Sequence, residues 1–190
     1  LKSYMVASWS KVINYILTPD KQVVDVIGLG FNMGHYLWQD LVGISVLSEN
    51  GVLDKLDKVL TGPGDYFSSQ DIFPEIPADK FMEVKDVRDL FDKVIENNYV
   101  ALRVNGIFIK QQLIERIYAV CRQRCPHEFL QKIEQAKQQC FPLLAFQIKA
   151  RQSRRIWQSQ VEGIANIINH LHAEYPKLGI VFDGWSITGT

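Results

Sequence analysis

The sequence lacks an excess of either sign of charge, because 21 Lys and Arg residues balance 21 Asp and Glu residues among 190. A protein that binds nucleic acid through its phosphates needs an excess of basic charge, so we expect no general nucleic-acid partner. The sequence also lacks the run of roughly 18 apolar residues that a membrane-spanning helix requires, which predicts no transmembrane segment. With 47% hydrophobic and 22% charged residues, the composition is that of a globular protein with a buried core.

Cysteine is scarce, and the three cysteines form no metal-binding pattern. Cys121, Cys125 and Cys140 are an odd number, and no Cys or His pair stands near them at zinc spacing. We therefore expect reduced thiols, no metal site and a cytoplasmic location, with peripheral association with a membrane left open. The chain begins at Leu1 without a signal peptide and stops at Thr190 just after a predicted strand, so we expect a piece of a longer protein.

Apolar β-branched runs alternate with amphipathic stretches along the chain. Strands are predicted at 23–27, 57–60, 80–84, 99–104, 142–148 and 178–182, and the main helices at 2–17, 35–48, 86–96, 110–122, 127–139 and 156–174. This alternation predicts an α/β fold with Rossmann-like parallel sheets, and ligands at the carboxyl ends of the strands.

The last quarter of the chain is predicted to form one βαβ unit, whose two strands must be parallel. Its helix is expected to face inward through Val161, Ile164, Ala165, Ile168 and Leu171. We predict a first Rossmann-like domain over residues 1–140 and the beginning of a second, incomplete one over residues 141–190.

A glycine-rich turn, Gly28-x-Gly30-x-x-x-Gly34-His35, follows the first predicted strand. Such a turn lets a ligand approach the backbone and the amide groups of the next helix. It fails as a dinucleotide fingerprint, because the third glycine comes one residue late and no acidic residue ends an obvious second strand about 20 residues on. A tight structural turn and a substrate-binding loop both remain open.

His35 is the histidine placed where a strand end meets a helix start. A neutral imidazole there suits a general base, because its unperturbed pKa is near 6.5, while a capping or packing histidine is the alternative. Asn32 is a candidate polar contact or a left-handed turn residue. Asp40 lies one and a half turns further on and is a poor partner for His35 by helical geometry.

Four cations lie between a predicted buried strand and the helix after it: Lys149, Arg151, Arg154 and Arg155. A helix N-terminus disfavours cations unless an anion is present, and guanidinium groups bind phosphate in a bidentate manner. The cluster therefore predicts an anion site, with a solvated basic surface as the alternative. Asp183, at the end of the last strand, suits a sugar hydroxyl, although Asp-Gly is also a common turn.

Two stretches of the chain resemble GT-B-type glycosyltransferases. The runs 146–151, 154–164 and 180–184 look like the opening of the second domain of these enzymes, where a strand, a basic loop and a helix meet the diphosphate of a nucleotide sugar. The run 32–40 is similar to an asparagine–glycine–histidine turn on the acceptor side of the first domain. The resemblance implies a base, His35, and donor-phosphate contacts at Lys149, Arg151, Arg154 and Arg155. Asn32 and Gly34 in the glycine turn and Asp183 at the end of the last strand are further candidates for substrate contacts by their positions.

The function expected from this resemblance is transfer of a sugar from a nucleotide-sugar donor to a hydroxyl of a carbohydrate or glycoconjugate acceptor. Arginines and helix amides suffice to stabilise a departing diphosphate, so neither a metal nor a cofactor is expected. Patterns of serine hydrolases and P-loop NTPases are absent from the sequence. Two alternatives remain: a non-catalytic α/β module that binds an anionic ligand or a protein partner, and a nucleotide- or phosphosugar-handling enzyme that is not a transferase.

Overall fold

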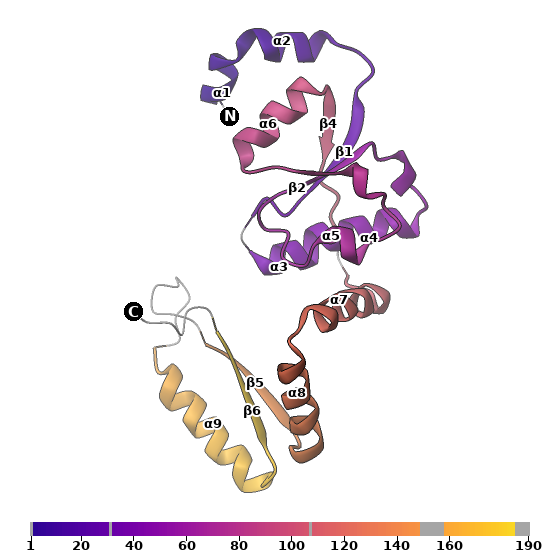
Figure 1. The fold of residues 1–190 in the computed structure, drawn as a ribbon. Helices are drawn as coiled ribbons and strands as arrows, with labels where there is room; N and C mark the ends of the chain where they lie inside the picture. The colour runs from indigo at the N-terminus through magenta and orange to yellow at the C-terminus, as the bar shows by residue number, and fades with distance from the viewer. Residues whose placement is uncertain (1, 31, 107, 149–157, 185–190) are drawn as a thin grey trace. The chain divides into compact units, whose positions relative to one another are not determined.

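The computed structural model describes residues 2–30, 32–106, 108–148 and 158–184, with the backbone alone at 183 and 184. The chain divides into two units, residues 1–124 and 125–190 (Figure 1). Lys149, Arg151, Arg154 and Arg155, the predicted basic loop, lie outside the described residues. The predicted domain boundary at 140/141 falls inside the second unit, after its first helix.

The first unit contains a sheet of four parallel strands in the order β3-β2-β1-β4. The strands are β1 (Gln22–Ile27), β2 (Lys58–Thr61), β3 (Phe81–Glu83) and β4 (Tyr99–Leu102). The strand β1 is central and buried, which its run of valine and isoleucine predicts, because a parallel sheet is covered on both faces. The prediction of an α/β, Rossmann-like fold is thus confirmed for this unit.

Helices cover both faces of the sheet in the first unit (Figure 1). The helical segments are α1 (Lys2–Ala7), α2 (Trp9–Leu17), α3 (Met33–His35), the π-helix η1 (Tyr36–Leu41), α4 (Val42–Glu49), η2 (Leu53–Lys55), α5 (Ser69–Ile72), η3 (Ala78–Lys80), α6 (Val87–Glu96) and α7 (Gln111–Arg124). The helix α6 begins where predicted, because the carboxylate of Asp86 accepts hydrogen bonds from the amides of Arg88 and Asp89.

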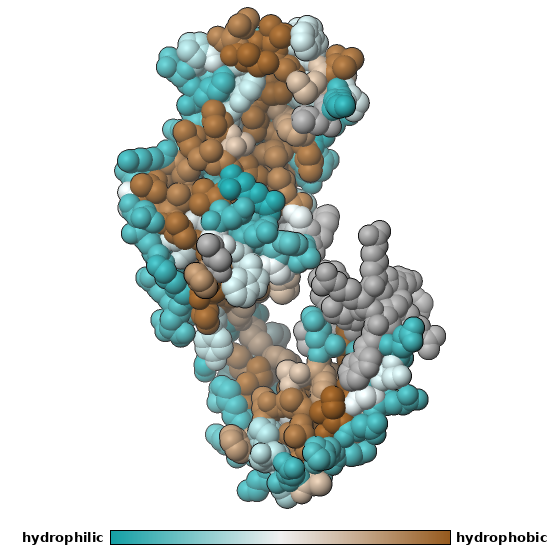
Figure 2. Space-filling view, turned by 180° about the vertical axis from the view of Figure 1, so that it is seen from behind, coloured by the Kyte–Doolittle hydropathy of each residue, from teal (hydrophilic) through white to brown (hydrophobic). Residues whose placement is uncertain are grey.

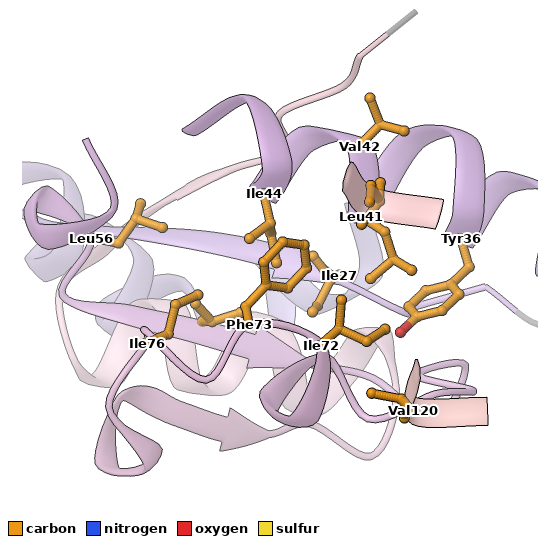
Figure 3. Close-up of a cluster of buried hydrophobic side chains, with 12 residues drawn as sticks. Ile27, Tyr36, Leu41, Val42, Ile44, Leu56, Ile72, Phe73, Ile76 and Val120 are labelled. Atoms are coloured by element: carbon orange, nitrogen blue, oxygen red, sulfur yellow. The ribbon is translucent and has the colours of Figure 1, made fainter. Parts of the chain in front are cut away.

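Two hydrophobic cores lie on opposite faces of the sheet. The larger one includes Ile27 of β1, Ile44 of α4 and Phe73 after α5, whose side chains lie together in Figure 3. The smaller one includes Val24 and Val26 of β1 and Leu90 of α6. The alternation of side chains along β1 sends Val24 and Val26 to one face and Ile27 to the other, so a single strand anchors both cores.

Three predicted elements of the first unit differ in detail from the structure. The predicted helix 2–17 is broken at Ser8 into α1 and α2, and the predicted helix 35–48 is a succession of α3, η1 and α4. The predicted strand 99–104 ends at Leu102, because the chain then leaves the sheet and crosses the helical layer at Gly43. A Cβ atom on Gly43 would lie 1.9 Å from the carbonyl oxygen of Val104, so glycine is needed for that crossing.

The second unit consists of α8 (His127–Gln139), β5 (Leu143–Ile148), α9 (Gln160–Glu174) and β6 (Gly179–Gly184). The strands β5 and β6 are parallel, as the βαβ pattern predicts. The predicted inward face of the helix is right for Ile164, which is buried, and wrong for Val161, which is 83% exposed, and Ala165, which is also exposed. A two-stranded sheet covers only a narrow stripe of a helix, so residues at the margin of the stripe face water.

Candidate functional site

The strand order identifies the part of the first unit where a ligand is expected. From β1 the chain proceeds to β2 and β3 on one side of the sheet, while β4 lies on the other side of β1. The direction in which strands are added to the sheet thus reverses at β1. In open parallel sheets, ligands bind at the point of such a reversal, outside the carboxyl ends of the strands. In this chain, Gly28 follows β1 and Arg103 follows β4 at that place.

The glycine turn after β1 packs directly against the loop after β2. The amide of Gly62 donates to the carbonyl of Ile27 at 2.9 Å, and the amide of Gly64 donates to the carbonyl of Gly28 at 2.7 Å. A Cβ atom on Gly64 would lie 2.1 Å from the carbonyl oxygen of Gly30. Glycine at these positions therefore allows two backbone segments to touch, which is the role of a tight structural turn.

The carboxylate of Asp40 joins this turn to the end of β4. Its Oδ2 accepts a hydrogen bond from the amide of Gly28 at 2.8 Å, and its Oδ1 accepts from Nε and Nη2 of Arg103 at 3.2 and 3.0 Å. Asp40 is buried, whereas the Arg103 side chain is 48% exposed. The amide of Gly28 is thus bonded to a carboxylate of the protein itself, whereas a dinucleotide-binding turn presents its amides to the phosphates of the ligand.

A second carboxylate, that of Asp25 on β1, is completely buried near Asp40. Its Oδ1 accepts hydrogen bonds from the amides of Val26 at 2.9 Å and Val104 at 3.4 Å, while its Oδ2 has no hydrogen-bond partner within the described part of the chain. Burial raises the pKa of Asp25 to about 6 and the charge of Asp40 adds to this rise, while the two amides and Arg103 oppose it.

The loop after β2 is held by a network around the carboxylate of Asp65. Asp65 accepts hydrogen bonds from the hydroxyl of Tyr36 and from both the amide and the hydroxyl of Ser69. The Tyr36 ring is buried in the larger core (Figure 3). Burial and the neighbouring Asp65 charge raise the pKa of Tyr36 above its ordinary value, so this hydroxyl is a hydrogen-bond donor and not a base.

The structure places Asn32, Gly34 and His35 together in one exposed turn after β1. The side-chain oxygen of Asn32 accepts a hydrogen bond from the amide of His35 at 3.1 Å, so Asn32 caps the short helix α3. The His35 side chain is exposed and is followed directly by the buried Tyr36. Asp40 is not its partner, because both Asp40 oxygens bond to Gly28 and Arg103, which agrees with the expectation from helical geometry.

The remaining predicted site residues belong to the second unit. Lys149, Arg151, Arg154 and Arg155 follow the carboxyl end of β5 in sequence but lie outside the described residues. Asp183 lies on β6 in register with Gln147 of β5, one residue before Ile148 pairs with Gly184. Asp183 and Ile148, the last residue of β5, therefore lie at the same carboxyl edge of this two-stranded sheet.

Sequence reasoning missed the acidic and basic residues that the fold brings close to the glycine turn after β1. Asp25, Asp40, Asp65 and Arg103 are separated by up to 78 positions, and none was assigned to the site. A charged residue within the apolar run Val23–Ile27 was the available signal for Asp25, because an acidic residue on a buried strand needs partners or a role.

Neither a membrane-spanning helix nor a metal-binding cluster occurs in the described residues. No helix there is long and apolar enough to cross a bilayer. No group of three or more His, Cys, Asp or Glu side chains in the same residues is arranged to hold a metal ion. In comparisons with known proteins, no family model, curated protein or solved structure matches this chain.

Proposed function

We propose that the chain belongs to a GT-B-type glycosyltransferase that moves a sugar from a nucleotide-sugar donor to an acceptor hydroxyl without a metal ion. The first unit would bind the acceptor, and the basic loop of residues 149–155 would bind the donor diphosphate. The observation that carries this proposal is the exposed imidazole of His35 at the carboxyl edge of a Rossmann-like parallel sheet.

The chemistry assigned to His35 is the removal of the acceptor proton. As the acceptor oxygen bonds to the anomeric carbon, the bond from that carbon to the diphosphate breaks and the electron pair leaves with the phosphate oxygen. The hydroxyl proton passes to the imidazole, whose basicity suits this step near neutral pH. Lys149, Arg151, Arg154 and Arg155 would neutralise the charge that develops on the leaving group.

The internal hydrogen bonds of the glycine turn support an acceptor-side assignment. The amide of Gly28 is bonded to Asp40, and the amide of Gly64 is bonded to Gly28. Two carboxylates, Asp25 and Asp40, and one guanidinium, Arg103, lie at this end of the sheet, so a diphosphate there would meet a net negative charge. A neutral hydroxyl-bearing acceptor meets no such penalty, so the donor phosphates are better accommodated by the basic loop.

Calorimetric titration with uridine and guanosine diphosphate tests the donor site. We expect the protein to bind one of the two nucleotides, and the double variant Arg151→Ala/Arg155→Ala to weaken that binding at least about tenfold, because two charge-assisted contacts are lost. The variant Lys132→Ala/Lys137→Ala, which removes the same charge from α8, is the matched control and should bind as the parent does. A parent protein that binds neither nucleotide contradicts the proposal.

A non-catalytic α/β module is the second candidate, and one observation favours it. A glycine turn whose amides are already bonded internally is also what a purely structural turn would show. Such a module would keep the basic loop for an anionic ligand but would assign no role to His35. If the protein binds the nucleotide but transfers no sugar to an acceptor hydroxyl, the result favours this module over the enzyme.

A further inference from the structure

The helical segment after the glycine turn has one buried side and one exposed side. Tyr36 and Asp40, four residues apart, are buried, and the ring of Tyr36 lies in the larger core (Figure 3). His35, Trp38 and Gln39 lie on the other side, because residues three and four positions apart share one side of a helix. His35 and Trp38 are exposed, and Gln39 is half-buried. This side follows the carboxyl end of β1, where the strand order predicts a ligand.

Trp38 is the large aromatic residue on the exposed side of this segment, and it is 53% exposed. A single exposed apolar side chain is common on protein surfaces and is not by itself a site. Trp38 differs from such a residue in its position, because it lies about one turn from His35 and next to Gln39. Its indole offers an apolar face and an N–H donor at its edge, which suits a ligand that is apolar on one face and polar around its rim.

The polar groups beside Trp38 are held in place by a buried carboxylate. Oδ1 of Asp40 accepts hydrogen bonds from Nε and Nη2 of Arg103, and Oε1 of Gln39 accepts one from the same Nη2 at 3.3 Å. Nη1 of Arg103 and the side-chain nitrogen of Gln39 have no hydrogen-bond partner among the described residues. The Arg103 side chain is 48% exposed. Two planar groups of fixed orientation thus offer N–H donors that the hydroxyl oxygens of a ligand can accept.

The charges at this end of the sheet favour a neutral ligand. Among the described residues, Arg103 is the cation bonded to the segment, and Asp40 already pairs with it. Asp25 is buried near Asp40, and Asp65 is bonded to the hydroxyl of Tyr36. Three carboxylates therefore stand against one guanidinium, and their excess charge repels an acidic ligand but does not oppose a neutral one.

We propose that Trp38, Gln39 and Arg103 form the acceptor subsite beside His35, and that its ligand is a neutral sugar ring. The indole of Trp38 packs against the C–H face of the ring, while Gln39 and Arg103 donate hydrogen bonds to its hydroxyl groups. His35 lies on the same side of the segment, as removal of the acceptor proton requires. The role of the sugar as an acceptor rests on the proposed function, but its binding is measurable without a donor.

Titration with simple glycosides, followed by ¹⁵N NMR of the protein, tests this subsite. The probes are the methyl glycosides of glucose, galactose and mannose, each with the methyl glycoside of its uronic acid. We expect at least one neutral glycoside to shift the indole N–H resonance of Trp38 and the side-chain amide resonance of Gln39, and its uronic acid to bind at least about fivefold more weakly. The proposal is overturned if no neutral glycoside shifts these two resonances, or if the uronic acid binds as well or better.

Matched variants separate this subsite from non-specific binding. Trp38→Gln should weaken glycoside binding at least about tenfold, whereas Trp9→Gln, at a 61% exposed tryptophan of α2, should leave it unchanged. Arg103→Lys keeps the charge but loses the planar fork, so it should weaken binding about fivefold, whereas Arg88→Lys should not weaken it. Equal losses in either pair overturn the proposal, as does a dimer that forms without sugar and is abolished by Trp38→Gln. Circular dichroism confirms that each variant is folded.

Nucleotide titration and a transfer assay distinguish this inference from the proposed function. A protein that binds a neutral glycoside through Trp38, but binds neither uridine nor guanosine diphosphate, has the subsite without being the transferase. In an active protein, Trp38→Gln should raise the KM for the acceptor at least about tenfold and leave the KM for the donor unchanged, because the indole contacts the acceptor alone. An active protein in which this variant leaves the acceptor KM unchanged is the transferase without this subsite.

Discussion

At the scale of single residues, Asp25 is a buried acid, and its Oδ2 has no hydrogen-bond partner among the described residues. Its pKa is about 6 in the folded protein, against an ordinary value of 3.8. The folded state therefore holds the proton more tightly than the unfolded state does. The stability that this proton provides is fully present below about pH 4 and is lost as the pH rises through 6, about 3 kcal/mol in total.

The variant Asp25→Asn tests this pH dependence. Because the amide does not titrate, the variant should lack the decline in unfolding free energy between pH 4 and pH 8, and at pH 8 it should be more stable than the parent. Urea unfolding at several pH values within this range measures both effects. The same slope in parent and variant would show that Asp25 is not the titrating group.

Asp40 and Glu96 each form an ion pair, but their environments differ. Asp40 is 3% exposed and bonds to Arg103 and to the amide of Gly28, while Glu96 is 53% exposed and bonds to Lys11. Asp40→Ala should lower the free energy of unfolding by about 3 kcal/mol, because it leaves a buried amide and a guanidinium without their acceptor. Glu96→Ala should cost less than about 1 kcal/mol. Chemical denaturation compares the two, and similar costs would contradict the assigned role of Asp40.

His35 differs from these acids because its side chain is exposed, so its loss should affect chemistry and not stability. Under the proposed function, His35→Ala should reduce the rate of sugar transfer about 10²- to 10⁴-fold while the unfolding midpoint stays unchanged, as expected for a lost general base. His127→Ala, at an exposed histidine in the first turn of α8, is the control. A His35→Ala protein that turns over donor as fast as the parent removes the base assignment.

At the scale of elements, the contact between the turn after β1 and the loop after β2 depends on a missing side chain. Gly64→Ala would place a Cβ atom 2.1 Å from the carbonyl oxygen of Gly30, whereas a Cβ atom on Gly30 itself would meet nothing within 4 Å. We expect Gly64→Ala to lower the unfolding free energy by about 2 kcal/mol or more, and Gly30→Ala to change it by less than about 0.5 kcal/mol. Thermal unfolding measures the difference, and two equally stable variants would show that the two loops separate easily.

At the scale of the whole molecule, buried residues are unevenly divided between the two units. Both described cores lie in the first unit, whereas β5 and β6 expose Leu143, Ile180, Val181 and Phe182. Backbone amides of β1 and β2 should therefore exchange with solvent at least about tenfold more slowly than those of β5 and β6, because local opening costs less where less apolar surface is buried. Hydrogen exchange followed by mass spectrometry measures this, and equal protection in both sheets would contradict it.

Local patterns were enough to predict most strands and helices of both units. The strands β1 and β2, the helices α6 and α8 and the parallel pairing of β5 with β6 all follow from apolar runs, helical stripes and caps that lie within a few residues of one another. The interruptions were not predictable in this way. The early end of β4 depends on how the chain crosses at Gly43, which is a contact between segments about 60 residues apart. The π-helix that carries Asp40 follows from no local pattern.

The amino-acid sequence alone was sufficient for the alternation of strands and helices and for the exposed turn with Asn32, Gly34 and His35, because hydrophobic periodicity and glycine placement act over short distances. The pairing of Asp40 with Arg103, the burial of Asp25 beside them and the outward apolar face of α2 appear only in the folded chain. These features depend on strand order and on which side of each helix meets the sheet, and both are set by packing between residues that are far apart in the chain.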